Sequence, residues 1–150
     1  MILKHLLVIF LLHGLFSPGD DPAQLHLSKE IEIKAGFFNT DDEQNIYLMQ
    51  NHQLLKYFPP YDQYISYDFR KDGTPEFIDV TNPDCIVLLF RESGKVVVLN
   101  DSLENEMDPF YLNQIGLYDI TAIAASADEN LWFYNHSENI IIKLNENCIP

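Results

Sequence analysis

One run of acidic residues has the composition of a metal site. Asp41, Asp42 and Glu43 offer three adjacent carboxylates, and carboxylate oxygens are the ligands that Ca²⁺ prefers. The run lacks the Asp-x-Asp-x-Asn-Gly spacing that wraps oxygen atoms around the ion. A solvated turn is therefore expected at these residues.

The histidines and serines have no partners at catalytic spacing. His26, His52 and His136 lie far apart, with no Cys or carboxylate at ligand spacing, so zinc or iron binding is not predicted. A hydrolase would need a serine, cysteine or threonine beside a base, and neither Gly-x-Ser-x-Gly nor a comparable motif is present. These motifs predict no catalytic residue and no cofactor, which favours a non-enzymatic protein.

The composition is that of an acidic folded protein. The 150 residues carry a formal net charge of −14, and 47% of them are hydrophobic and 13% aromatic, which is enough for a packed core. The negative field repels phosphate groups, so binding to nucleic acids or to anionic lipid is not expected. Solubility is the first explanation for the charge, and an acidic patch for a cationic partner is the second.

The first residues have the order of a secretory signal peptide. Lys4 precedes an apolar run at 6–16 that is too short to span a bilayer, and Ser17-Pro18-Gly19 gives a polar break with small residues. Residues 1–19 are predicted to be a signal peptide. The mature chain is then expected to have no membrane span and to be periplasmic or extracellular.

Pairs of short apolar runs, each pair split by turn-forming residues, recur along the chain. They predict three β-hairpins, formed by residues 46–49 with 54–57, 86–90 with 96–99, and 131–134 with 140–144. Further strands are predicted at 35–39, 76–80 and 120–125 before the hairpins, and at 63–69 and 110–114 after the first two. A first edge strand is expected at 25–34, within a lead segment of residues 20–35.

The hairpins recur at a nearly constant interval. Tyr47, Leu89 and Trp132 occupy the first strand of each pair and lie 42 and 43 residues apart. A period in the low forties with four short strands per unit is typical of a β-propeller blade. The runs are apolar at consecutive positions, which indicates strands buried on both faces, as in sheets stacked face to face. We predict an all-β fold: a partial β-propeller of about three four-stranded antiparallel blades after the signal segment.

The predicted blades cover residues 36–150, at about 36–74, 75–117 and 118–150. Three units fall short of the four to eight blades that close a propeller, and the last lacks an outer strand. The terminal blades would expose apolar faces and strand edges. The sequence therefore predicts either self-association through these blades or a truncated product of a longer gene. It leaves open whether Cys85, expected inside an apolar strand, pairs with Cys148.

Two turns share a motif. Residues 126–133 read Ser-Ala-Asp-Glu-Asn-Leu-Trp-Phe, and residues 42–47 read Asp-Glu-Gln-Asn-Ile-Tyr. Both resemble the Asp-x-x-Asn-Leu-Trp signature of NHL-type and sensor-type β-propeller repeats, and residues 36–145 resemble small exported propeller proteins of Bacteroidetes. Asn45 and Asn130 are expected to close the turn into each hairpin, while Tyr47 and Trp132 fill the core between blades.

The resemblance to propellers brings the innermost strands together on a central axis, where propeller enzymes such as lactonases and lyases have their active sites. In this chain the inner strands offer Asn39, Asp79, Asn82 and Asp119. These residues would hold a cation or simply line a polar channel. Asp79 and Asn82 are the candidate metal ligands of an enzyme of the lactonase or lyase type.

The leading hypothesis is a non-enzymatic binding or scaffolding module of the cell envelope. It would hold an unknown protein or glycan partner through loops at one end of the axis. Aromatic residues around Pro59-Pro60 would suit sugar or peptide recognition if exposed, but packing of the outer strand is the expected explanation. They are Tyr57, Phe58, Tyr61, Tyr64 and Tyr67. The propeller enzyme and a truncated product without activity of its own are the alternatives.

Overall fold

The computed structural model describes residues 26–30, 32–128 and 130–145. The chain divides into two units, residues 1–32 and 33–150, and the strands found in the described residues all lie in the second. The predicted signal peptide at 1–19 and Cys148 lie outside the described residues. Among the described residues, no helix is long and apolar enough to cross a bilayer.

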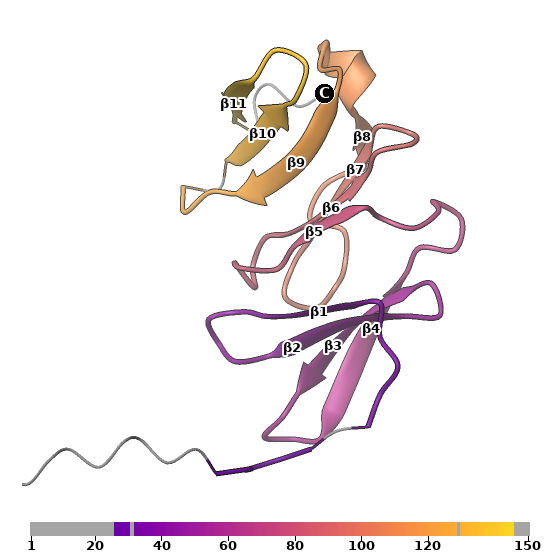
Figure 1. Ribbon diagram of the computed structural model, residues 1–150, viewed down its shortest axis with the longest axis vertical. Coiled ribbons are helices and arrows are strands. Elements are labelled where there is room, and N and C mark those ends of the chain that lie inside the picture. The colour runs from indigo at the N-terminus through magenta and orange to yellow at the C-terminus, as the bar shows by residue number, and fades with distance from the viewer. Residues whose placement is uncertain (1–25, 31, 129, 146–150) are drawn as a thin grey trace, which may run out of the picture. The chain divides into compact units, whose positions relative to one another are not determined.

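The first sheet contains four antiparallel strands in sequence order (Figure 1). The turn between its second and third strands consists of Asn51 and His52, which both have positive φ, as tight two-residue hairpin turns require. The strands begin and end within two residues of the predicted positions. They are β1 (Phe37–Thr40), β2 (Ile46–Gln50), β3 (Gln53–Phe58) and β4 (Gln63–Asp68).

The second sheet also has four antiparallel strands in sequence order, and the third has three, in the order β11-β10-β9. The outer strand of the second sheet is only two residues long because the chain then enters a 3₁₀ turn, η1 (Leu112–Ile115), which ends at Gly116 with φ of 76°. The predicted strand at 110–114 is thus correct only at its start. The strands are β5 (Phe77–Asp79), β6 (Ile86–Phe90), β7 (Lys95–Leu99), β8 (Phe110–Tyr111), β9 (Ile120–Ala125), β10 (Leu131–Asn135) and β11 (Ile140–Leu144).

The three central hairpins have equivalent registers, because the first residue of β2, β6 and β10 pairs with Tyr57, Leu99 and Leu144 respectively. Equivalent positions can therefore be matched strand by strand. We call the side of each sheet that carries Tyr47, Val87 or Trp132 its front face. The opposite side, which carries Ile46, Ile86 or Leu131, is its back face.

The second sheet is buried on both faces. All five residues of β6 are buried, as predicted from its uninterrupted apolar run. On its back face, Ile86 and Leu88 pack with Tyr47 and Leu54 of the first sheet. On its front face, Val87 and Leu89 pack with Leu131 and Phe133 of the third.

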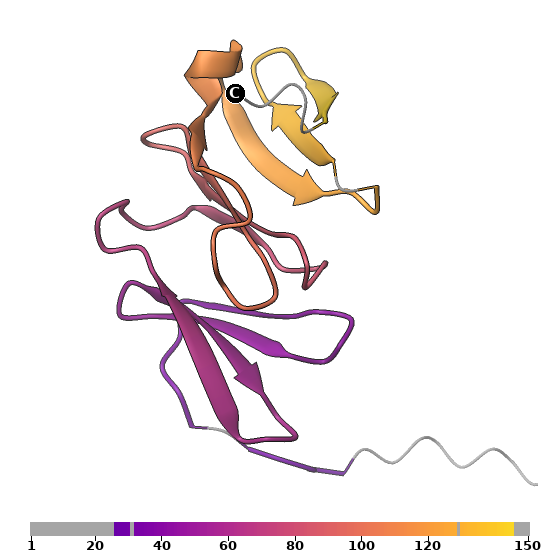
Figure 2. The ribbon, with the colours of Figure 1, turned by 180° about the vertical axis from the view of Figure 1, so that it is seen from behind.

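The same order of sheets is visible from behind, with β5–β8 between the other two sheets (Figure 2). Each sheet begins with its inner strand, and β5 and β6 both contact β9 of the next sheet. Antiparallel sheets stacked front to back in this way are the blades of a propeller. The fold is all-β, a partial β-propeller of three blades, as predicted.

Two local predictions are wrong. The described residues of the expected strand at 25–34 form no strand and are exposed, because β1 already occupies the edge of the first sheet and the run Ser28-Lys29-Glu30 has no apolar side chain to bury. Cys85 does not lie inside a strand. It directly precedes β6 and is half-buried beside the core formed by the second and third sheets.

The packing of the core predicts that two leucines contribute very differently to the free energy of unfolding. Leu88 is fully buried and Leu27 is 81% exposed. Leu88→Ala is expected to lower the free energy of unfolding by about 2–5 kcal/mol, since it removes packed methyl groups and leaves a cavity, while Leu27→Ala changes it by less than about 0.5 kcal/mol. Urea denaturation followed by circular dichroism measures both. Equal effects of the two substitutions would contradict the stacked arrangement.

Candidate functional site

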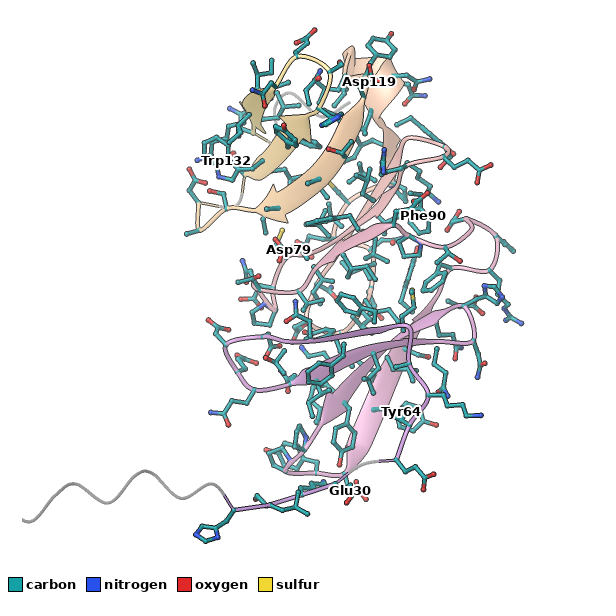
Figure 3. The ribbon with its side chains drawn as sticks, viewed as in Figure 1. Glu30, Tyr64, Asp79, Phe90, Asp119 and Trp132 are labelled. Carbon is teal, nitrogen blue, oxygen red and sulfur yellow. The ribbon has the colours of Figure 1, made fainter. Side chains whose placement is uncertain are left out.

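The four polar residues nominated for the propeller axis do not meet at one place. Asn39 pairs with Tyr47 and Asp79 pairs with Val87, so the two occupy equivalent positions near the end of their inner strands. Asp119 instead precedes β9, whose six residues at about 3.3 Å each place it about 20 Å from Ala125 at the other end. Figure 3 shows Asp79 and Asp119 beside opposite ends of β9.

Both carboxylate oxygens of Asp79 accept hydrogen bonds from backbone N–H groups. Oδ1 accepts from Thr81 at 3.0 Å, which closes the turn after β5. Oδ2 accepts from Ala125 of β9 at 2.9 Å, across the junction between the second and third sheets. The free edge of an inner strand has N–H groups that the ladder does not pair, so Asp79 satisfies one of them and joins two blades.

Asn82 and Asn39 also form local hydrogen bonds. Oδ1 of Asn82 accepts from the N–H of Asp84 at 3.0 Å, and Oδ1 of Asn39 accepts from Thr40 at 2.9 Å. These are turn contacts of the kind that Asn commonly makes. Within the ranges that the structure describes, no cluster of three or more His, Cys, Asp or Glu side chains has the arrangement of a metal site. The pair Asp79 and Asn82 therefore stays a prediction as a cation site.

The acidic run contains one buried carboxylate. Asp42 and Glu43 are exposed, but Asp41 is only 7% exposed, so the expectation of a solvated turn is wrong for this residue. Its oxygens accept from the backbone N–H and Nδ2 of Asn45 and from the hydroxyl of Tyr47, each at 2.9 Å. The buried Tyr47 hydroxyl needs a partner, and Asp41 supplies it.

Lys56 carries a charge into the junction between the first two sheets. It is 2% exposed, pairs across the hairpin with Tyr47 and places its ammonium group 5.6 Å from the Tyr47 ring centre and 5.4 Å from that of Phe58. Nζ also donates to the backbone carbonyl of Asp101, between β7 and β8, at 3.0 Å. A buried ammonium group is stable only with such partners.

The third sheet has the same pairing of a lysine with an aromatic ring, but on an exposed face. Lys143 pairs with Trp132, lies 4.8 Å from its ring centre and forms an ion pair of 2.6 Å with Asp128. The hydrogen bond from Lys143, together with those from Ser126 and Asn130, holds the pKa of Asp128 well below its usual range. Trp132 is 38% exposed, so its role in a core between blades stays a prediction. The backbone carbonyl of Asn130 accepts from the N–H of Ser126 at 2.8 Å, across the turn that leads into the hairpin.

A cleft of about 460 Å³ opens where loops of the second and third sheets meet at one end. Its walls come from the residue before β5, the turn between β6 and β7, the 3₁₀ turn η1 and the segment that leads into β9. Three carboxylates and one guanidinium line it, so its lining is acidic. The polar lining residues are Glu76, Arg91, Glu92, Ser93, Asn113, Tyr118 and Asp119.

Backbone and side-chain hydrogen bonds fix the walls of this cleft. Oε2 of Glu76 accepts from the N–H of Arg91 at 2.7 Å, and the N–H of Leu112 donates to the carbonyl of Gly94 at 2.9 Å. Nδ2 of the buried Asn135 donates to the carbonyl of Tyr118 at 3.1 Å. Sequence reasoning missed the cleft because its residues come from three separate segments of the chain, at 76, 91–94 and 112–120, without a shared motif.

The histidines and tyrosines singled out from the sequence lie apart. His52 and His136 occupy hairpin turns of different sheets, and their rings pack against Phe69 and Tyr134 respectively. Tyr67 packs against the core between the first and second sheets, as expected of a residue in an outer strand. Tyr61 and Tyr64 are 74% and 70% exposed, so packing does not account for these two rings.

No protein-family model and no curated protein sequence matches this chain. Among solved structures it is similar to a streptogramin B lyase, with 15% identity and a TM-score of 0.49 over 75% of this chain and 42% of that chain. It is also similar to virginiamycin B lyase from Staphylococcus aureus, with 12% identity, a TM-score of 0.48, and coverage of 72% and 40%. The extracellular domain of a protein assigned as a one-component system of B. thetaiotaomicron matches with 14% identity, a TM-score of 0.44, and coverage of 74% and 18%. The chain spans about two fifths of the length of the lyases.

The role of Asp79 between two blades predicts a stability effect. Asp79→Ala leaves the N–H of Ala125 without its acceptor and is expected to lower the free energy of unfolding by about 1–3 kcal/mol. Asp84→Ala, which removes an exposed carboxylate nearby, is the matched control and is expected to change it by less than about 0.5 kcal/mol. Chemical denaturation measures both, and equal values would show that the Asp79 contact does not join the blades.

The buried phenol predicts a loss of stability at alkaline pH. Burial, and then the hydrogen bond to Asp41, raises the pKa of Tyr47 above its ordinary value of 10.0. Above that pH the unfolded chain releases this proton while the folded chain keeps it, so the free energy of unfolding falls by up to about 1.4 kcal/mol per pH unit. Below that pH the contribution is fully present.

Tyr47→Phe is expected to remove this component of the pH dependence between pH 10 and 11. The control is Tyr64→Phe, because the Tyr64 ring is 70% exposed, and it is expected to keep the wild-type slope. Urea titrations at several pH values give the slopes. A Tyr47→Phe slope equal to that of the wild type would contradict the assignment.

Proposed function

We propose that this chain is an exported, non-enzymatic binding module of the cell envelope, which holds a protein partner through the cleft between the second and third blades. The observation that carries the proposal is the cleft itself. It has a preformed wall of loops, a volume of about 460 Å³ within the range of ligand sites, and a set of convergent polar groups.

The charge of the cleft favours a basic segment of the partner. Glu76, Glu92 and Asp119 outnumber Arg91, and the whole chain carries a formal net charge of −14, so the field attracts cations. Tyr118, which is 63% exposed, adds an aromatic ring beside these carboxylates. A lysine or arginine side chain finds both carboxylate acceptors and a ring face there.

The contacts of Asp79 support a scaffolding role over a catalytic one. Its two oxygens bind backbone N–H groups of both the second and third blades, which makes the carboxylate part of the framework. An axial cation would compete with these hydrogen bonds. The residue best suited to metal chemistry thus already has a structural task.

The proposal is tested by NMR titration of the isotope-labelled chain with a blocked tri-lysine peptide. Chemical-shift changes are expected at the backbone amides of Ser93, Gly94 and Asn113. Glu92→Gln together with Asp119→Asn is expected to weaken binding several-fold, because each exposed ion pair contributes up to about 1 kcal/mol. Glu104→Gln together with Glu106→Gln removes the same charge outside the cleft and is expected to weaken binding less.

Two outcomes would contradict the proposal. If chitotriose shifts the cleft resonances and the peptide does not, the partner is a glycan. If CaCl₂ or ZnCl₂ raises the unfolding temperature of the wild type but not of Asp79→Ala, a cation site of the enzymatic kind is favoured instead.

A further inference from the structure

The back face of the first sheet repeats the face that the second sheet buries. Matched through the register of the hairpins, all five central positions are apolar in both sheets. In the second sheet they form the core against the first sheet. The matched pairs are Phe38 with Ile78, Ile46 with Ile86, Leu48 with Leu88, Leu55 with Val97 and Tyr57 with Leu99.

The front face of the third sheet repeats the face that the first sheet buries. The four matched positions carry an aromatic ring, a large side chain, a branched aliphatic and a lysine. The lysine lies against the ring in both sheets. The matched pairs are Trp132 with Tyr47, Tyr134 with Met49, Ile141 with Leu54 and Lys143 with Lys56.

The two repeated faces are only partly covered, with Phe38 exposed on the first and Trp132 and Ile141 exposed on the third. On the face of the first sheet, Leu48 is 7% exposed and Ile46, Leu55 and Tyr57 are half-buried. Phe38 is 67% exposed and its counterpart Ile78 is 9% exposed. Ile141 is 69% exposed, while its counterpart Leu54 is fully buried. Large apolar side chains on a continuous sheet face indicate a contact surface.

We propose that these faces are the two halves of one interface between two copies of this chain. The front face of the third sheet of each copy packs on the back face of the first sheet of the other, as the first sheet already packs on the second within a copy. Each copy supplies one face of each kind, so the contact is head-to-tail and closes when it forms twice. Two copies of the three described sheets then place six blades around one axis, within the four to eight of closed propellers.

The occupant is a second copy because the chain carries both complementary surfaces. The internal junction shows what such a surface needs, which is the apolar set of the second sheet opposite Tyr47 and Leu54. Opposite Lys56 it supplies a backbone carbonyl oxygen, that of Asp101. The first sheet presents a set of the same kind at the same positions. This inference does not depend on the proposed function, because neither face includes the cleft.

The test is analytical ultracentrifugation of the full chain. The wild type is expected to sediment as a pair with twice the mass of one chain. Ile141→Asp and Phe38→Asp are each expected to shift the protein to single copies and to weaken association at least tenfold. Both side chains are largely exposed in one copy, so the fold of each variant is retained. Tyr118→Asp, at a loop residue of 63% exposure outside both faces, is the control and is expected to sediment as a pair.

Mixing the two variants separates a head-to-tail contact from others. An equimolar mixture of Ile141→Asp and Phe38→Asp contains one intact junction, between Ile141 of one copy and Phe38 of the other, and is expected to recover a pair. Recovery also shows that both variants are folded. The proposal is overturned if the wild type sediments as single copies, if it forms an open series of larger species, or if Phe38→Asp associates like the wild type.

Discussion

The structure depends on keeping both faces of one short sheet away from water. Every residue of β6 is buried, and so are four of the five residues of β7, so these strands have no wet side. An antiparallel sheet of this kind is stable only when another layer covers each face. Each buried aliphatic side chain contributes about 1.5–3 kcal/mol relative to exposure, so the neighbouring sheets hold the second one in place and are held by it.

The same burial dictates how the polar groups are used. Four polar side chains are buried among the residues that the structure describes, namely Asp41, Asn45, Lys56 and Asn135. In the part of the chain that the structure describes, every buried side-chain nitrogen or oxygen has a hydrogen-bond partner. Since an unsatisfied buried group costs about 1–3 kcal/mol, carboxylates that looked available for chemistry serve turns and blade junctions instead. Loops at the ends of the sheets, where backbone groups meet water, line the cleft that we propose as a binding surface.

The sequence predicted the three sheets but did not predict the cleft, and both outcomes have the same physical reason. Consecutive apolar residues, as in β6, indicate a strand that is buried on both faces. The interval between the hairpins indicates the repeat. The architecture can therefore be predicted from local sequence patterns. The positions of β9, β10 and β11 follow from the same signals. The prediction of a strand at 25–34 was wrong. Alternating apolar and polar residues form a strand only where the edge of another strand is available for pairing.

Predicting the candidate site would have required the distances between segments that are far apart in the sequence. Local sequence patterns do not contain these distances. Asn39 and Asp79 occupy equivalent inner-strand positions, but Asp119 lies at the other end of β9, which only the register reveals. The burial of Asp41 depends on the hydroxyl of Tyr47, six residues further on and across a turn. The cleft is lined by three separate segments of the chain, none of which carries a recognisable motif by itself.

The pairing of a lysine with an aromatic ring occurs twice in the structure, once on a buried face and once on an exposed face. Tyr47 with Lys56 and Trp132 with Lys143 have the same pairing, and in both the ammonium group lies against a ring. In the first sheet the lysine is buried and donates to a backbone carbonyl. In the third sheet the lysine is exposed to solvent and donates to Asp128. An ammonium group keeps an acceptor either way, because a ring and a hydrogen-bond acceptor replace water when the face is covered. The lysine therefore has a hydrogen-bond acceptor both on the exposed face of the third sheet and on the covered face of the first.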